Sequence, residues 1–256
     1  MNHGAARRPF WTRSAATDMA MTREDGWSYR VLKHGFPGCM GTLGAYVLTL
    51  DPGCVPHPVH NHGEEEILIP LAGAVDVLQS GPDVIRLSPG TLLFHPTGHQ
   101  HTHRGASAQP AEFVVLKWSV PGLTAVPPDN VAFFAETDTG PEAWVERGGI
   151  RRRRVWERVP LAAGGHCEAE VIEMSPETGY PVHSHEHDLC LVLTQGRLAG
   201  LGHLSVAPAV IYYPAGTPHG AAPTNPEPLR MIAIEFHRPD ARTSGQAFAN
   251  RRVSAE

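Results

Sequence analysis

Histidine is the residue type that dominates the chemistry of this sequence, since 16 of its 256 residues are histidines. In the first half of the chain, His60, His62 and Glu66 are separated by even numbers of residues. Side chains alternate between the two faces of a strand, so these three would project to the same side. Two imidazoles and a carboxylate are ligands that a divalent transition metal takes. The spacing therefore predicts a metal site.

A fourth ligand is predicted from the next group of histidines. His101 follows a Pro-Thr-Gly turn at residues 96–98 and would reach the site from a separate strand. Three neutral imidazoles and one carboxylate suit Fe(II), Mn(II), Ni(II) or Zn(II), and they leave coordination positions for water or substrate. His99 and His103 share the strand parity of His101, and we predict that they serve as catalytic groups that move protons in the pocket. A position at the rim is the alternative for both.

The pattern occurs twice in the chain. Residues 60–73 align without gaps on residues 183–196, and residues 96–101 align on residues 214–219. An internal repeat of this kind predicts a duplicated domain. The chain should therefore contain two similar modules.

The second copy lacks one of the predicted ligands. His183, His185 and His219 are retained, and three histidines can hold zinc with an open fourth position, which makes them a predicted second site. Leu189, however, stands where the first copy has Glu66. A module that is structural, or that binds only an organic ligand, is the alternative. We expect close to one metal per chain.

Short apolar runs bounded by Gly, Pro and Asp predict the strands that position these residues. The runs cover residues 46–50, 66–71, 91–94 and 113–116, and then residues 170–174, 189–193, 210–213 and 231–236. Many short strands, together with 26 glycines and 24 prolines, indicate an all-β sandwich or barrel. The expected segments are an N-terminal tail (1–25), a first barrel with the intact metal site (26–125), a linker (126–154), a second barrel with a degenerate site (155–240) and a C-terminal tail (241–256).

These residues resemble the cupin superfamily. Its first motif, G-x5-H-x-H-x3,4-E-x6-G, is matched by His60, His62, Glu66 and Gly73. Its second motif, G-x5-P-x-G-x2-H-x3-N, is matched by Gly90, Pro96, Gly98 and His101. Cys54 replaces the opening glycine of the first motif and Gly105 the closing asparagine of the second, and neither position is a ligand. The resemblance implies two tandem jelly-roll β-barrels, a bicupin, with the metal inside the barrel.

The resemblance also implies candidate functions. Among bicupins it implies a non-haem dioxygenase of the quercetinase or gentisate type, in which the open metal position activates dioxygen. One alternative is a redox-neutral Mn or Zn hydrolase, decarboxylase or isomerase, as in the bicupin ureidoglycine aminohydrolases, although these carry their intact site in the C-terminal barrel. The other alternative is a non-catalytic bicupin that binds a small molecule.

Charge and composition limit the kinds of binding partner that are expected. The formal charge of −5 gives no electrostatic reason to expect nucleic acid or an anionic membrane, and no apolar run approaches the ~18 residues of a membrane-spanning helix. A small-molecule substrate is the expected partner. The four cysteines show no CxxC spacing, and we expect a cytoplasmic protein. The run at residues 67–71 is apolar on both faces, so another module or a second chain must cover it, and we expect a homodimer.

Overall fold

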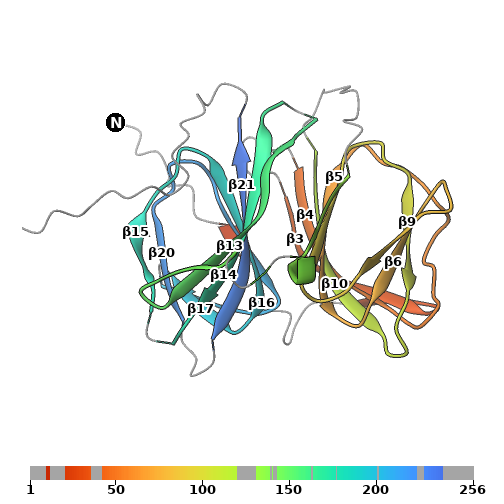
Figure 1. Cartoon of the computed structure of the whole chain (residues 1–256), viewed down its shortest axis with the longest axis horizontal. Coiled ribbons are helices and arrows are strands. Elements are labelled where there is room, and N and C mark those ends of the chain that lie inside the picture. Colours follow the sequence, from red (N-terminus) through yellow and green to blue (C-terminus); the bar gives the residue numbers. More distant parts are fainter. Residues whose placement is uncertain are drawn as a thin grey trace, which may run out of the picture.

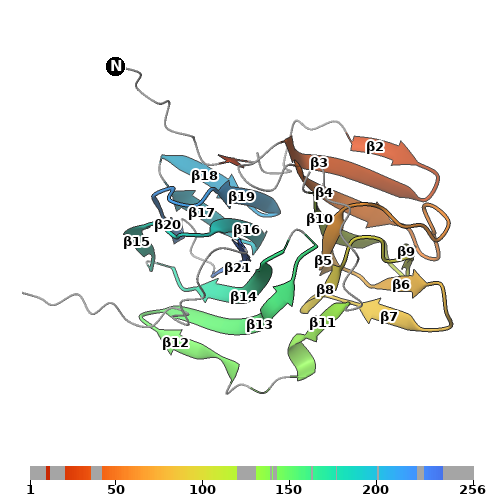
Figure 2. The same cartoon turned by 90° about the horizontal axis from the view of Figure 1, so that it is seen from above.

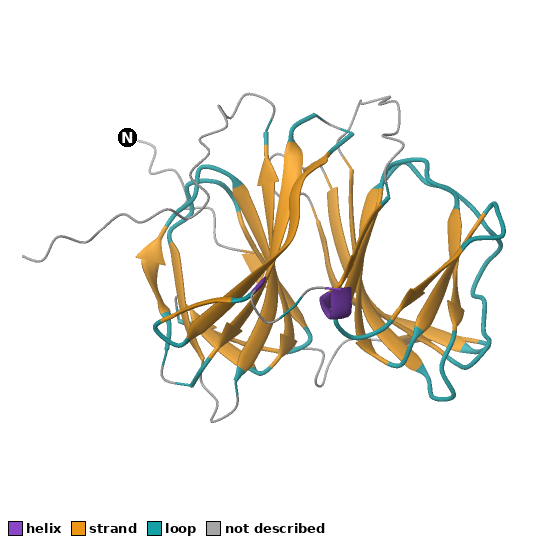
Figure 3. Cartoon of the chain, viewed as in Figure 1, coloured by secondary structure: helices purple, strands orange, loops and turns teal. Residues whose placement is uncertain are grey.

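The computed structural model describes residues 10–11, 21–35, 42–119, 131–138, 140, 143–162, 164–176, 178–200, 202–223 and 228–238. Two β-barrels lie side by side, and strands account for nearly all of the regular structure (Figures 1 and 3). A 3-10 turn, η1 (Glu136–Asp138), lies between β11 and β12. Among the residues described, no helix is long and apolar enough to cross a membrane. The predicted all-β class with two tandem barrels is confirmed.

The first barrel consists of a seven-stranded and a three-stranded sheet. The larger sheet has the order β11-β8-β5-β10-β4-β3-β2, and the smaller one has the order β7-β6-β9. The strands are β2 (Met21–Glu24), β3 (Trp27–Gly35), β4 (Thr42–Leu50), β5 (Glu65–Ala72), β6 (Val75–Gln79), β7 (Val84–Leu87), β8 (Thr91–His95), β9 (His101–Gly105), β10 (Ala111–Ser119) and β11 (Ala132–Ala135).

The second barrel repeats this arrangement. Its seven-stranded sheet has the order β1-β19-β16-β21-β14-β13-β12, and its smaller sheet has the order β15-β20-β17-β18. The strands are β1 (Phe10–Trp11), β12 (Val145–Arg147), β13 (Ile150–Pro160), β14 (His166–Met174), β15 (Tyr180–His183), β16 (Asp188–Gln195), β17 (Arg197–Gly200), β18 (His203–Val206), β19 (Ala209–Tyr213), β20 (His219–Pro223) and β21 (Leu229–His237).

The two barrels exchange edge strands. β1 precedes the first barrel in the chain but pairs with β19 of the second, whereas β11 precedes the second barrel but pairs with β8 of the first (Figure 2). An uncovered sheet edge presents free backbone groups, and the added strands pair with them. The segments expected to be a tail (1–25) and a linker (126–154) therefore contribute strands, namely β1 and β2 in one and β11, β12 and the start of β13 in the other.

The two larger sheets pack against each other through their outer faces. On β10, Val114 and Leu116 belong to the core between the barrels, whereas Phe113 and Val115 belong to the core of the first barrel. The shared core also contains Ile67, Ile69, Trp118, Cys190, Ile234 and Phe236. A sheet buried on both sides needs strands with two apolar faces. The second barrel thus covers the apolar run at residues 67–71, and this run gives no support to the expected homodimer.

Two adjacent carboxylates on β5 point to opposite sides of the sheet. Glu65 faces the other barrel, where it accepts hydrogen bonds from Trp118 Nε1 at 2.9 Å and from the backbone nitrogen of Ala162 at 2.7 Å. Glu66 faces the interior of the first barrel, and its side chain is fully buried. The strand alternation therefore assigns Glu65 to the joint between the barrels and Glu66 to the interior, where the histidines gather.

Candidate metal centre

The first barrel brings the predicted ligands together from three elements. Glu66 lies on β5, His101 begins β9, and His60 and His62 lie in the loop before β5. The backbones of His60 and His101 pair as an isolated bridge, with N···O distances of 3.1 and 2.9 Å. The turn before β9 includes Gly98 at φ +77°, a conformation that glycine adopts without strain. The loop and the turn thus meet beside Glu66.

The nitrogen and oxygen atoms of these side chains converge. The Nε2 atom of His62 lies 3.4 Å from Glu66 Oε2, and that of His101 lies 3.6 Å from Glu66 Oε1. One ring nitrogen each of His60, His62 and His101 lies within 4.8 Å of the others. Two ligands at about 2.1 Å from a tetrahedral metal are about 3.4 Å apart. His62 and His101 thus have the spacing from Glu66 that one divalent ion requires, and His60 lies beside these two histidines.

Two of the histidines have a fixed tautomer. The Nδ1 atom of His62 lies 3.0 Å from the carbonyl oxygen of Glu64, and that of His101 lies 2.9 Å from the carbonyl oxygen of His99. A carbonyl only accepts hydrogen bonds, so Nδ1 must carry the proton in both rings. The lone pair is then on Nε2, which faces Glu66. This is the arrangement found when an outer hydrogen bond orients a metal-binding imidazole.

Buried polar atoms at this place lack hydrogen-bond partners. They are Nε2 of His101 and both ring nitrogens of His95 and His103, all of them beside Glu66. Burying a polar group without a hydrogen-bond partner lowers the free energy of unfolding. A bound ion or water that contacts the whole cluster would remove this penalty. The donor set is imidazole and carboxylate, which fits a divalent transition metal. The residues present therefore fit the metal that was predicted.

His95 is a member of this cluster that the sequence analysis did not assign. Its side chain is fully buried, and its ring stacks on that of His101 at 4.3 Å between centroids. One atom each of Glu66, His95, His101 and His103 lies within 4.8 Å of the others, so His101 belongs to two overlapping groups. The register of β5 and β8 pairs Glu66 with His95. This strand register is what places His95 beside Glu66, and the sequence alone does not reveal which strands pair.

The two histidines predicted to be catalytic lie at different depths. His103 is buried, with Nε2 at 3.7 Å from Glu66 Oε1, so it borders the ligand cluster. His99 is half-buried and stacks on His95 at 5.0 Å, one ring further from Glu66. The structure thus brings His103, but not His99, to the predicted ligands. Their catalytic roles stay predictions.

Lys117 is a second residue of the site that the sequence analysis did not single out. It lies on β10 directly opposite Glu66 in the strand register. Its Nζ atom is 2.9 Å from Glu66 Oε2 and 3.2 Å from His62 Nε2. The ammonium group thus spans two predicted ligand atoms. A lysine at an inward position of an otherwise apolar strand is the sequence feature that could have revealed it.

Burial and charge set the protonation states at the site. Burial alone would raise the pKa of Glu66, but the neighbouring His62 and the positive charge of Lys117 hold that pKa well below its usual range. Burial lowers the pKa of His101 to about 4 and that of His103 to about 3. The pKa of His95 is also lowered well below its ordinary value by burial. At neutral pH His95, His101 and His103 are therefore uncharged, the form that binds a metal.

These shifts predict how the stability of the metal-free protein depends on pH. His101 and His103 ionise near pH 6.5 in the unfolded chain but only near pH 4 and 3 when folded. Between these values the unfolded state binds more protons, so the free energy of unfolding falls as the pH falls from 6.5 to about 4, by up to about 1.4 kcal/mol per pH unit for each histidine. Urea titrations at pH 7, 6 and 5 with a chelator present measure this slope. Replacing His103 with Gln should flatten it, and equal slopes in both proteins would contradict the assignment.

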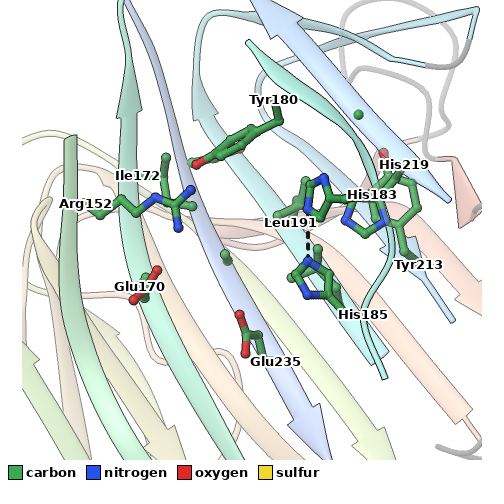
Figure 4. A pocket seen from close by; sticks show the side chains of 14 residues that line it. Arg152, Glu170, Ile172, Tyr180, His183, His185, Leu191, Tyr213, His219 and Glu235 are labelled. Carbon is green, nitrogen blue, oxygen red and sulfur yellow. Dashed lines mark hydrogen bonds between the residues drawn. The ribbon is translucent and has the colours of Figure 1, made fainter. Parts of the chain in front are cut away.

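The second barrel brings its three predicted histidines together as well. The Nε2 atoms of His183 and His185 are 3.2 Å apart, and one nitrogen of His219 lies within 4.8 Å of both (Figure 4). Nδ1 of His183 and of His219 donates to a backbone carbonyl at 2.8 and 2.9 Å, so the lone pair of each ring is on Nε2. Leu189 lines the same pocket at the place of the missing carboxylate. Whether these residues hold a metal stays a prediction.

The sequence of the first barrel matches a known family, and part of the chain matches a known relative. Residues 46–117 match the Cupin domain family. Over 76 residues the chain is 40% identical to dimethylsulfoniopropionate lyase DddQ of Ruegeria pomeroyi, a stretch that covers 30% of this chain and 37% of the relative. The chain therefore spans little more than a third of the curated relative it matches.

Solved structures are similar to both barrels together. The oxalate decarboxylase of Lactobacillus farciminis in complex with formate has a TM-score of 0.68 at 16% identity, covering 93% of this chain and 88% of that one. A putative glyoxylate-induced protein from Pseudomonas aeruginosa has a TM-score of 0.66 at 15% identity, covering 92% and 94%. At such identities the likeness shows the fold alone. The predicted pair of tandem jelly-roll barrels is thereby confirmed over nearly the whole chain.

Proposed function

The chain is a member of the cupin superfamily, and from that premise we propose that its first barrel is the centre of a metal-dependent lyase for a small carboxylate substrate. The observation that carries the proposal is the position of Lys117, whose ammonium group lies between Glu66 and His62. The local identity to a dimethylsulfoniopropionate lyase supports the same class of reaction. His60, His62, Glu66 and His101 are the proposed metal ligands.

The charges at the site favour an anionic substrate. A divalent ion held by Glu66 and His62 has the Lys117 ammonium as its neighbour, and two adjacent cations repel each other. An anionic group that contacts both removes this repulsion. A carboxylate has two oxygens and fits such a pair of partners. The site therefore selects for substrates that carry a carboxylate.

The proposed reaction is an elimination. A proton leaves the carbon next to the carboxylate, its electron pair forms a carbon–carbon double bond, and the leaving group on the next carbon departs with its bonding pair. When bound, a divalent metal supplies a Lewis acid that polarises the carboxylate and makes that proton more acidic. The apolar half of the barrel, which includes Leu68, Val115 and Phe113, excludes water from the substrate. His103, next to Glu66, is the proposed acceptor of the proton.

A dioxygenase is the second candidate. Three histidines and one carboxylate with open coordination positions also suit Fe(II), which activates dioxygen. The two functions differ in one requirement, because an elimination needs no oxidant, whereas a dioxygenase consumes dioxygen together with the substrate. Assays under nitrogen and in air, with an oxygen electrode, separate them.

Lys117 should control substrate affinity. The test supplies the chain with Fe(II), Mn(II), Ni(II) or Zn(II) and offers dimethylsulfoniopropionate under nitrogen, with the alkene product followed by nuclear magnetic resonance. We expect turnover, and we expect that Lys117→Met raises KM by about 10–100-fold because a charged hydrogen bond to the carboxylate is lost.

Lys117→Arg is the matched control, since it keeps the positive charge and should retain most of the affinity. Turnover of this or another small carboxylate only with oxygen uptake would favour the dioxygenase. If Lys117→Met left KM unchanged, the carboxylate would not bind where we propose.

A further inference from the structure

The two barrels differ by an exchange of charge between neighbouring strands. In the first barrel Glu66 on β5 faces Lys117 on β10 in the strand register. In the second barrel the equivalent pair is Leu189 on β16 and Glu235 on β21. The carboxylate that the sequence alignment finds missing has therefore not left the second barrel. It stands on the neighbouring strand, where the first barrel has its lysine.

Glu235 is surrounded by a group of histidines different from the three that align with the first barrel. Its Oε2 atom lies 3.1 Å from Nε2 of His187 and 3.3 Å from Nε2 of His237. One atom from each of the three side chains lies within 4.8 Å of the others. The rings of His187 and His185 are 4.7 Å apart, so this group borders the pocket of Figure 4, into which Glu235 and His185 both point.

The strand geometry explains why these three side chains meet. Glu235 and His237 lie two residues apart on β21 and so share one face of the strand. Asp188 at the start of β16 pairs with Phe236, which places the preceding residue, His187, beside the end of β21. Two neighbouring strands thus supply two imidazoles and one carboxylate at one mouth of the barrel.

An ordinary ion pair explains this group less well than a bound cation does. The Glu235 side chain is only 11% exposed, and two imidazole nitrogens lie within 3.3 Å of its Oε2 atom. The Nε2 atom of His237 lies at hydrogen-bonding distance from Glu235 Oε2, 3.3 Å, and the buried Nε2 atom of His187 approaches the same oxygen at 3.1 Å. Ligand atoms around one metal ion also lie about 3.0–3.4 Å apart. A cation between these three side chains would offset the burial of the Glu235 carboxylate.

The first barrel serves as an internal comparison. The positions equivalent to His187, Glu235 and His237 are occupied there by Glu64, Lys117 and Ser119. The barrels differ at all three positions. The three side chains of the first barrel are not a set of metal ligands, whereas those of the second barrel are. The second group is therefore specific to the second barrel.

We propose that His187, Glu235 and His237 form a second site for a divalent transition metal, displaced from the position of the first barrel's site. Two imidazoles and one carboxylate leave coordination positions open, and this donor set suits Fe(II), Mn(II), Co(II), Ni(II) or Zn(II). The chain then holds two metals, one in each barrel, and the number of metals per chain exceeds the one expected from the sequence.

The test counts Co(II) bound to the full chain from its visible ligand-field absorption, and it measures affinity by competition with a chelating dye. The background carries His101→Ala, which removes the residue shared by both ligand groups of the first barrel. We expect one Co(II) per chain in this background. Adding Glu235→Gln should weaken that binding by at least about tenfold, since even partners outside the ligand set cost 10–100-fold.

Two matched variants separate this site from its neighbours. Glu170→Gln removes another carboxylate of the same pocket and should leave Co(II) binding unchanged. His183→Gln removes one of the three aligned histidines and should also leave it unchanged. The proposal is overturned if the His101→Ala background binds no Co(II), or if Glu235→Gln binds it normally. Loss of binding in His183→Gln with retention in Glu235→Gln would assign the metal to His183, His185 and His219 instead. These outcomes do not depend on whether the first barrel is a lyase.

Discussion

Replacing His101 with alanine should empty the first barrel of metal and abolish its activity. His101 is the residue common to both ligand groups of that barrel, and its Nε2 atom lies 3.6 Å from Glu66 Oε1. The loss of a direct ligand should reduce metal affinity by more than the 10–100-fold that outer partners cost, on the order of 1,000-fold. Elemental analysis of protein purified without added metal measures the content, and turnover of the carboxylate substrate measures the activity.

His183→Ala is the matched control in the second barrel. His183 also lies beside other histidines, with its Nε2 atom 3.2 Å from that of His185. If the metal of the second barrel is held by His187, Glu235 and His237, His183→Ala should leave the metal content of the chain nearly unchanged. An equal loss of metal from both variants would contradict the asymmetry between the barrels.

The candidate ligands of the first barrel could be singled out from the sequence because most of the pattern is local. His60, His62 and Glu66 lie within seven residues, so they stay close in space although His60 and His62 lie in the loop before β5 and not on the strand. His101 is further along the chain, but a turn with a required glycine conformation marks its approach. The structure brings these four side chains together. Local spacing and turn chemistry were enough to find this cluster, and the role of its members as metal ligands stays a prediction.

His95, Lys117 and Glu235 could not be placed in the same way. Each reaches its partner across a strand pair, and the register of a strand pair depends on the packing of the whole sheet. Lys117 and Glu235 do leave a trace in the sequence, since each is a charged residue within an apolar run of β10 or β21. An alignment of the two halves compares equivalent positions, so it reports Glu66 as lost at Leu189. It does not report that a carboxylate reappears on the next strand.

The partner of the apolar outer face of β5 could not be identified from the sequence either. The two apolar faces of residues 67–71 indicated that this run is covered on both sides. Either the other barrel or a second chain could supply the outer cover. The structure shows that the other barrel does so, through residues such as Cys190, Ile234 and Phe236. Residues 67–71 therefore give no reason to expect a second chain.

Leu189→Glu should strongly destabilise the protein in the absence of metal. Leu189 is only 5% exposed, and Glu235 faces it on β21, so the change places two carboxylates opposite each other in a buried strand pair. An uncompensated buried charge costs about 3 kcal/mol or more, on the order of 10 °C in Tm for a chain of this length. Zn(II) or Co(II) should restore much of the lost stability, because His185 and the two carboxylates then have a cation to share.

The double variant Leu189→Glu/Glu235→Lys should restore stability without metal, since it builds into the second barrel the carboxylate and ammonium pair that Glu66 and Lys117 form in the first.

Leu191→Glu is the matched control, because Leu191 is 6% exposed and lies on the same face of β16 but pairs with Ala233. Neither metal nor Glu235→Lys should rescue Leu191→Glu. Thermal melts of these variants, each with and without Zn(II), test the comparison. Equal rescue of both leucine variants by metal would mean that binding elsewhere stabilises the chain, whereas rescue of Leu189→Glu alone would tie the effect to the strand pair that carries the exchanged charge.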